Sequence, residues 1–310
     1  MAFNFKGINE GGFAGYELTD QIQLNLMFWI EWGLLNNGAY NFYLSGQDSF
    51  FANNESILHP VIDERFPDRT VFDGVGREWV WESGVIPFSG NDAPFRVSGV
   101  YVNGNFVSIS DTGPYRHHVD YQRGRIIFDE SIPSSDEISA EYTSKAVHIG
   151  LADDSDFNLL MLDTVKEFLT DTVPSGTPSK DFQVWLPSIF VELESGESTG
   201  LQLGGGQIKT RIVKFHIFAD NKNDRNLLMD WLDYSNRSVF YMADLNKIQF
   251  PFNEYGDIIP GTTNWVDLTN NYPWKKLRCI GGRCKKINSL NTKLFRGLVT
   301  YNIEVDMENI

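Results

Sequence analysis

Residues 97–142 constrain the fold most strongly, because they read as a series of short antiparallel strands separated by tight turns. Asn103-Gly104 lies between two apolar runs, and this dipeptide supplies the two positive-φ positions of a type I′ hairpin turn. Arg123-Gly124 is expected to separate the next pair of strands in the same way. The stretch offers no nucleophile, general base or phosphate-binding loop, so it predicts a rigid β module rather than a chemical site.

Length and charge narrow the class of protein. The chain has 310 residues, enough for roughly two domains of about 150 residues each. Its 26 basic and 41 acidic residues give a net charge of −15, which argues against a protein that binds DNA by neutralising phosphates. The N-terminal residues lack the pattern of a signal peptide, and the apolar window 24–35 is too short to span a bilayer. We expect a protein without a membrane segment.

The sequence divides into three regions and predicts an α+β fold. Residues 1–70 contain a helix over 21–35, introduced by Thr19-Asp20 and stopped by Asn37-Gly38, followed by an extended arm. Residues 71–147 form a small antiparallel, sandwich-like β module. Residues 148–310 form an α/β sandwich with a long loop insertion at 245–296.

Alternation and helical spacing place the elements of this third region. Its predicted helices begin at Asp156 and near Asp224, and its predicted strands cover 184–194, 208–218, 239–242 and 298–306.

Trp29 and Trp32 lie at the end of the N-terminal helix that is apolar on nearly every side. Such a helix must be buried, either against its own chain or against a neighbouring subunit. We predict that both tryptophans contribute to an interface between copies of the chain.

The only two cysteines, Cys279 and Cys284, flank Gly281-Gly282. A two-residue hairpin turn at the glycines would bring the cysteines opposite each other, close enough for a disulfide. Without export the thiols stay reduced, and zinc would need a second ligand pair that this region lacks. Reduced structural thiols are favoured, and a disulfide formed after release from a cell is the alternative.

The same predicted hairpin carries the one basic cluster of this acidic chain. Six cations fall within twelve residues: Lys275, Lys276, Arg278, Arg283, Lys285 and Lys286. A docking patch for an acidic protein surface is the favoured interpretation; a solvated hairpin and a DNA contact are the alternatives.

Candidate catalytic and metal-binding motifs occur in the sequence, but the neighbouring residues do not provide the structure that each motif needs. Gly196-Glu197-Ser198-Thr199-Gly200 matches Gly-x-Ser-x-Gly, but a nucleophile elbow needs a helix after the serine, and a second strand follows here, with His216 the only histidine downstream. We therefore predict a hairpin loop, and no catalytic residue.

The segment 220–225 has the look of a calcium loop but lacks its glycine, so it predicts a helix cap. His118 and Asp120 would share a strand face near His117, yet two ligands make a poor metal site. No metal or cofactor is predicted.

Several segments resemble known virion proteins. Residues 79–85, 98–104, 119–121 and 124–129 resemble structural proteins of tailed bacteriophages. The helix at 156–171, the strand pair at 184–218, the helical segment 224–232 and the closing strand are together similar to the tail-terminator, or tail-completion, family.

That resemblance implies a non-enzymatic α+β subunit of a ring, expected to be a hexamer, in the virion. The ring would cap the tail tube and join it to the head, contacting tail-tube, sheath and neck or connector proteins, while DNA passes through its lumen without specific binding. The subunit would be made in the host cytoplasm. A receptor- or carbohydrate-binding fibre or baseplate module is the alternative, and an enzyme is a third, disfavoured class.

Overall fold

The computed structural model describes residues 18–44, 56–87, 90, 92–166, 184–194, 196–202, 205–235, 239–261, 264–287 and 293–306. These residues group into two compact units. Of the described residues, the first unit takes 32–146 and 249–264, and the second takes 18–31, 147–248 and 265–306. Helices and sheets both occur, which confirms the predicted α+β class.

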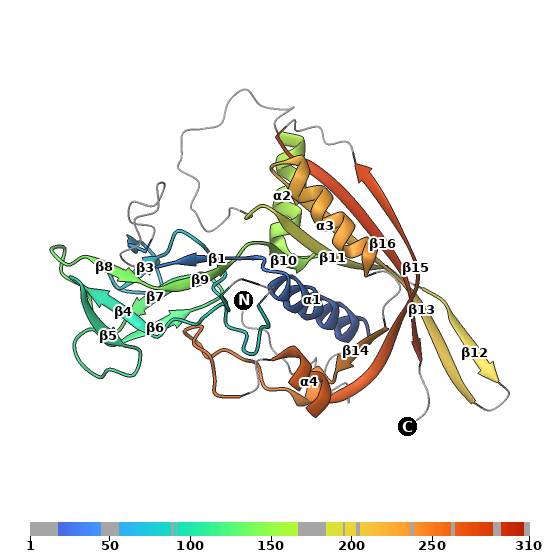
Figure 1. Cartoon of the computed structure of the whole chain (residues 1–310), viewed down its shortest axis with the longest axis horizontal. Helices are drawn as coiled ribbons and strands as arrows, with labels where there is room; N and C mark the ends of the chain where they lie inside the picture. The colour runs from blue at the N-terminus through green and yellow to red at the C-terminus, as the bar shows by residue number, and fades with distance from the viewer. Residues whose placement is uncertain are drawn as a thin grey trace. The chain divides into compact units, whose positions relative to one another are not determined.

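A seven-stranded sheet forms the second unit (Figure 1). Its order is β10-β11-β13-β16-β15-β14, with β12 paired to β13, and every pairing is antiparallel except that of β10 with β11. The strands are β10 (His148–Leu151), β11 (Ser188–Glu194), β12 (Ser198–Gln202), β13 (Gly205–Ala219), β14 (Val239–Ala243), β15 (Pro273–Ile287) and β16 (Phe295–Asp306).

Helices of the second unit pack on both faces of this sheet. They are α1 (Leu18–Asn36), of which residues 18–31 belong to this unit, α2 (Ser155–Lys166), α3 (Lys222–Tyr234), α4 (Trp265–Asn271) and the short 3-10 helix η2 (Leu245–Lys247). Helix α3 packs on β16, where the Tyr301 hydroxyl donates to the Leu232 carbonyl. Helix α2 packs on the opposite face, where the Phe157 ring lies 5.4 Å from Phe190 and 5.1 Å from His216.

The core of the second unit lies between α3 and the sheet. Because side chains alternate along a strand, every second residue of β13 and β16 points to this side. These residues are fully buried: Val213, Phe215, Ile217, Val299, Tyr301, Ile303 and Val305. Gly297 continues the same set, and a Cβ there would lie 2.6 Å from Met229 Sδ of α3, so glycine allows the helix to pack closely.

The first unit is built from short antiparallel strands in two sheets and one separate pair. One sheet has the order β2 (His59–Val61), β3 (Val71–Asp73), β7 (Arg125–Phe128), β6 (His117–Asp120). The other has the order β5 (Asn105–Ser108), β4 (Gly99–Val102), β8 (Ile138–Ala140), and β1 (Tyr40–Tyr43) pairs with β9 (Tyr142–Lys145). Its core includes Trp79 stacked on Tyr142 at 4.3 Å.

Turn predictions are largely confirmed in this unit. Asn103 and Gly104 have φ angles of 51° and 81° and join β4 to β5 as a two-residue turn. Gly38 has a φ of 81°, and its amide donates to the Leu35 carbonyl at the end of α1. The turn at Gly124 instead spans four residues between β6 and β7, because Asp120 pairs directly with Arg125.

Two predicted boundaries differ from those of the structure. Strands β1 and β2 are hydrogen-bonded to β9 and β3, so residues 40–43 and 59–61 belong with the β module rather than to a separate arm. Residues 245–296 are not a loop insertion, because they contain β15, which pairs with both β14 and β16. The aromatic residues that suggested a loop are distributed over α4, β15 and the segment 249–264 of the first unit.

Candidate interaction surface

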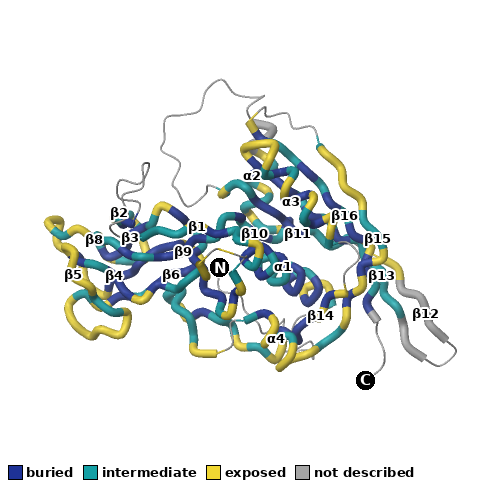
Figure 2. Tube along the Cα trace, viewed as in Figure 1, coloured by how far each residue is buried: buried dark blue, intermediate teal, exposed yellow. Residues whose placement is uncertain are grey.

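All six clustered cations lie on β15, which is one continuous strand and not a hairpin. Gly281 and Gly282 are paired with Asn302 and Tyr301 of β16. The predicted turn at the two glycines is therefore wrong, because the whole strand pairs with the long β16, a partner that local sequence does not reveal. Much of β15 is exposed (Figure 2).

A β-bulge divides β15 at Ile280. Cys279 pairs with Ile303, whereas Gly281 pairs with the adjacent Asn302, so Ile280 is an extra residue without a partner in the ladder. Side chains alternate along a strand, and the extra residue shifts this alternation by one position. As a consequence, even-numbered residues before the bulge and odd-numbered residues after it point to the same side.

Four of the six cations share one face of the sheet as a result. Paired residues project to the same face, and Arg278 pairs with Glu304 while Arg283 pairs with Thr300, both on the side away from α3. We call the β14–β15 part of this side the open face, and its exposed cations are Lys276, Arg278, Arg283 and Lys285. Lys275 and Lys286 alternate to the α3 side, and Lys286 pairs there with Gly297.

Strand β14 adds apolar surface to the open face. Tyr241 pairs with Lys276 and is 59% exposed, and the Lys276 ammonium lies 5.3 Å from the centre of the Tyr241 ring. Val239 pairs with Arg278 and is 47% exposed. A cation is attracted to the face of an aromatic ring, and tyrosine and arginine are both enriched in protein interfaces. The composition of the open face is therefore typical of an interface.

Cys279 and Cys284 are free thiols, and they lie on one strand rather than across a turn. Burial raises the pKa of Cys279. Burial, together with a hydrogen bond to Asp233, raises the pKa of Cys284 to about 12. Both residues are therefore protonated at neutral pH, as expected of structural thiols.

Trp29 and Trp32, predicted to form an interface, are packed within the chain. The Trp29 ring lies 4.2 Å from that of Phe240 and 5.6 Å from that of Trp231, both in the second unit. Trp32 is buried. This packing corrects the expectation that these side chains face a partner; the apolar end of α1 is covered by its own chain.

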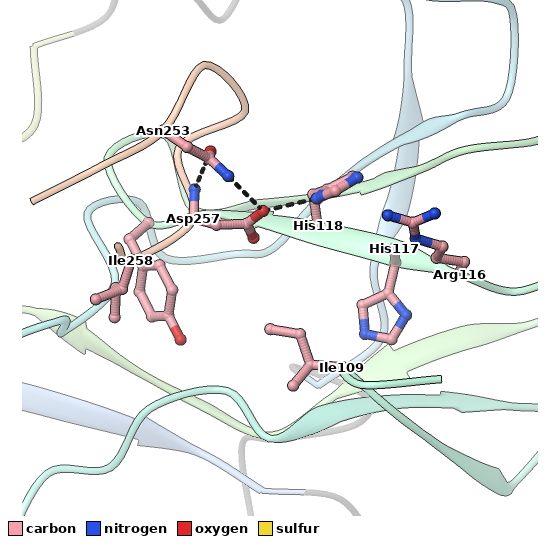
Figure 3. A pocket seen from close by; sticks show the side chains of 8 residues that line it. Ile109, Arg116, His117, His118, Asn253, Asp257 and Ile258 are labelled. Carbon is pink, nitrogen blue, oxygen red and sulfur yellow. Dashed lines mark hydrogen bonds and ion pairs between the residues drawn. The ribbon is translucent and has the colours of Figure 1, made fainter. Parts of the chain in front are cut away.

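A second cluster of polar side chains lies in the first unit, at His118 (Figure 3). His118 Nδ1 lies 2.6 Å from an Asp257 carboxylate oxygen, and Nε2 lies 3.1 Å from Asp129. The His118 ring stacks on Tyr255 at 4.1 Å. The sequence pattern placed His118 on a strand face with Asp120 and gave no sign of its contact with Asp257, which lies 139 positions further along the chain.

Asp257 holds a turn of the segment 249–264 against β6. Its other carboxylate oxygen accepts from the Val119 amide at 2.5 Å, and the Asn253 side-chain amide donates at 3.1 Å to the oxygen that contacts His118. A cavity of about 330 Å³ opens beside this turn, with Ile109 and His117 on its walls (Figure 3). Asp120, expected to share a face with His118, is buried and paired with Arg123.

His117 is buried beside this cavity and its ring is neutral at pH 7. Nδ1 donates to the Tyr115 carbonyl at 2.9 Å, which fixes the tautomer, and burial lowers the pKa of the imidazole. Among the residues that the structure describes, no three His, Cys, Asp or Glu side chains are grouped so as to hold a metal ion.

Two motifs predicted to be non-catalytic lie in the second unit, and the predicted helix cap is confirmed. Ser198 lies in the strand β12, which pairs with β13, so residues 198–200 form a strand rather than the predicted loop, and the segment after the serine is not the helix that a nucleophile elbow needs. His216 Nε2 lies 2.7 Å from Glu192. Asn221 caps α3 by accepting a hydrogen bond from the Asp224 amide at 2.9 Å.

No protein-family model matches the chain. No curated protein matches it. Across the helices that the structure describes, none combines the length and apolar character needed to cross a bilayer.

Proposed function

We propose that this chain is a non-enzymatic structural protein of a tailed-phage virion, forming a ring at the junction of neck and tail as a tail terminator or tail-completion protein. The observation that carries the proposal is the order of elements in the second unit. Helix α2, strands β11 and β13, helix α3 and the closing strand β16 follow one another as in the family that the sequence resembles.

The chemistry of the surface supports the same role. A net charge of −15 repels DNA, which suits a ring whose lumen the genome crosses without specific binding. On that acidic background, the open face concentrates cations where an acidic neighbour can be attracted. Rings are built from complementary patches on different sides of one subunit, and the exposed β14–β15 part of the sheet offers such a patch.

Electron microscopy of virions tests the proposal directly. Antibodies raised against the purified chain and coupled to gold should label the junction between head and tail. Negatively stained purified protein should show rings. Label at the tips of fibres or on the baseplate would contradict the proposal and favour a receptor- or carbohydrate-binding module, and label absent from virions would exclude a structural role in the particle.

A further inference from the structure

The open face and the outer surface of α3 carry exposed charges of opposite sign. The open face presents four exposed cations. On the other side, α3 covers the sheet with its buried residues and turns a different surface outward. That surface includes Asp230, Leu227 and Tyr234, and the last two are 68% and 93% exposed, while Asp233 flanks it beside Cys284.

The C-terminal half of α3 is negative. Residues 226–235 include Asp230 and Asp233 but no lysine or arginine. The last turn of the helix has no basic residue to offset the negative end of the helix dipole. An exposed leucine and an exposed tyrosine flank these charges, as in the anchors of protein interfaces.

The open face offers the matching features. Its cations complement the carboxylates of α3, and Val239 and Tyr241 of β14 complement Leu227 and Tyr234. Ile280, the extra residue of the bulge, adds an apolar side chain that is 50% exposed. A sheet face normally gains a second layer by packing against another element, and the C-terminal half of α3 has the size and charge to supply one.

We propose that the C-terminal half of α3 in one copy docks on the open face of a second copy. The inference rests on the proposed function, because it takes ring assembly as the setting. The two surfaces lie on opposite sides of one sheet, so they cannot meet within a chain. Contact between copies is therefore head-to-tail, which closes into a ring or continues as a filament.

Charge-reversing substitutions on each of the two surfaces test the docking. The open-face variant is Lys276→Glu with Arg283→Glu, at positions paired with Tyr241 and Thr300 rather than with an acidic residue. The helix variant is Asp230→Lys with Tyr234→Lys, which leaves the buried residues of α3 unchanged. Sedimentation velocity of the full chain measures self-association, and circular dichroism checks that each variant is folded.

Each variant alone should weaken self-association by about tenfold or more, because like charges then face each other. The chain carrying all four substitutions should recover association, and so should an equimolar mixture of the two variants. The control, Arg116→Glu with Lys247→Glu, reverses the same number of charges elsewhere and should associate like the wild type.

Wild-type association in the open-face variant would overturn the inference. So would failure of the folded four-substitution chain to recover, or a wild-type chain that sediments only as a monomer. Gold labelling at the neck combined with any of these results would leave the proposed function standing and remove only this docking mode.

Discussion

Asn25 of α1 and the backbone of Ala243 exchange two hydrogen bonds. The Asn25 side-chain amide donates to the Ala243 carbonyl at 3.1 Å, and the Ala243 amide donates to the Asn25 side-chain oxygen at 2.7 Å. Asn25 is buried, and it occupies the place that a further strand would take beside β14, the last strand of the sheet. Gln21 continues the contact by accepting from the Leu245 amide. A helix side chain thus closes part of an open sheet edge.

Asn25→Leu should therefore destabilise the protein. Two backbone groups at Ala243 would lose their partners inside the unit, at a cost of about 1–3 kcal/mol each. Urea unfolding should show a free energy of unfolding lower by about 2–5 kcal/mol. Asn37→Ala, at an exposed asparagine just after the same helix, should change it by well under about 1 kcal/mol. Equal values for the two variants would show that the edge contact contributes nothing.

The stability of the protein should fall as the pH drops below about 6.5, the ordinary value for histidine. Burial lowers the pKa of His117 and of His216, so below that pH the unfolded chain binds protons that the folded chain does not. The stabilising contribution is complete above the unfolded pKa and is lost as the pH falls toward the folded pKa. His117→Phe should reduce this slope, whereas His59→Gln, at an exposed histidine, should not. Identical slopes in all three proteins would refute the assignment.

Asp257→Asn should loosen the turn at 253–257 without unfolding the β module. The substitution removes the charge that His118 and the Val119 amide contact, interactions worth about 1–3 kcal/mol in a partly buried site. Amide hydrogen exchange in residues 253–257 should accelerate by about tenfold or more. Glu254→Gln, in the same turn but exposed, is the matched control. Unchanged protection in the Asp257 variant would mean that packing alone holds the turn.

Lys285→Glu with Lys286→Glu should leave folding of the isolated chain unchanged and reduce the yield of completed, head-joined tails, most visibly at low salt, where the charges are least screened. The bulge refines this expectation, because only Lys285 lies on the open face. Lys285→Glu alone should carry the defect, and Lys286→Glu should behave like the wild type. Tail assembly in vitro, scored by electron microscopy over a series of salt concentrations, measures both. Normal assembly by the double variant would show that this end of β15 is merely solvated.

Sequence patterns predicted the features that are set within a few residues. Asn103-Gly104 makes its turn, Gly38 ends its helix and Asn221 caps α3, because each conformation depends on local backbone preference. The α+β class and most strands of the second unit followed from alternation.

Features that depend on distant pairing were missed. Gly281-Gly282 was interpreted as a turn, since its pairing with β16 is a tertiary property. Asp257 could not be connected to His118 for the same reason. Trp29 was assigned to an interface because its covering residues, Phe240 and Trp231, lie some 200 positions away in the chain.

The bulge at Ile280 sets which residues in the second half of β15 point to each face of the sheet. Whether a later residue of β15 points to the open face or to the α3 side depends on whether it lies an odd or an even number of positions after Ile280. The register of the strand, and not only its composition, therefore decides which side chains are on each face. A register slip that paired Ile280 with Asn302, and each later residue of β15 with the next position of β16, would turn Arg283 and Lys285 toward α3 and bring Cys284 and Lys286 to the open face. That slip of one position would exchange one guanidinium and one ammonium group for a thiol and an ammonium group, with no substitution made at any of the four sites.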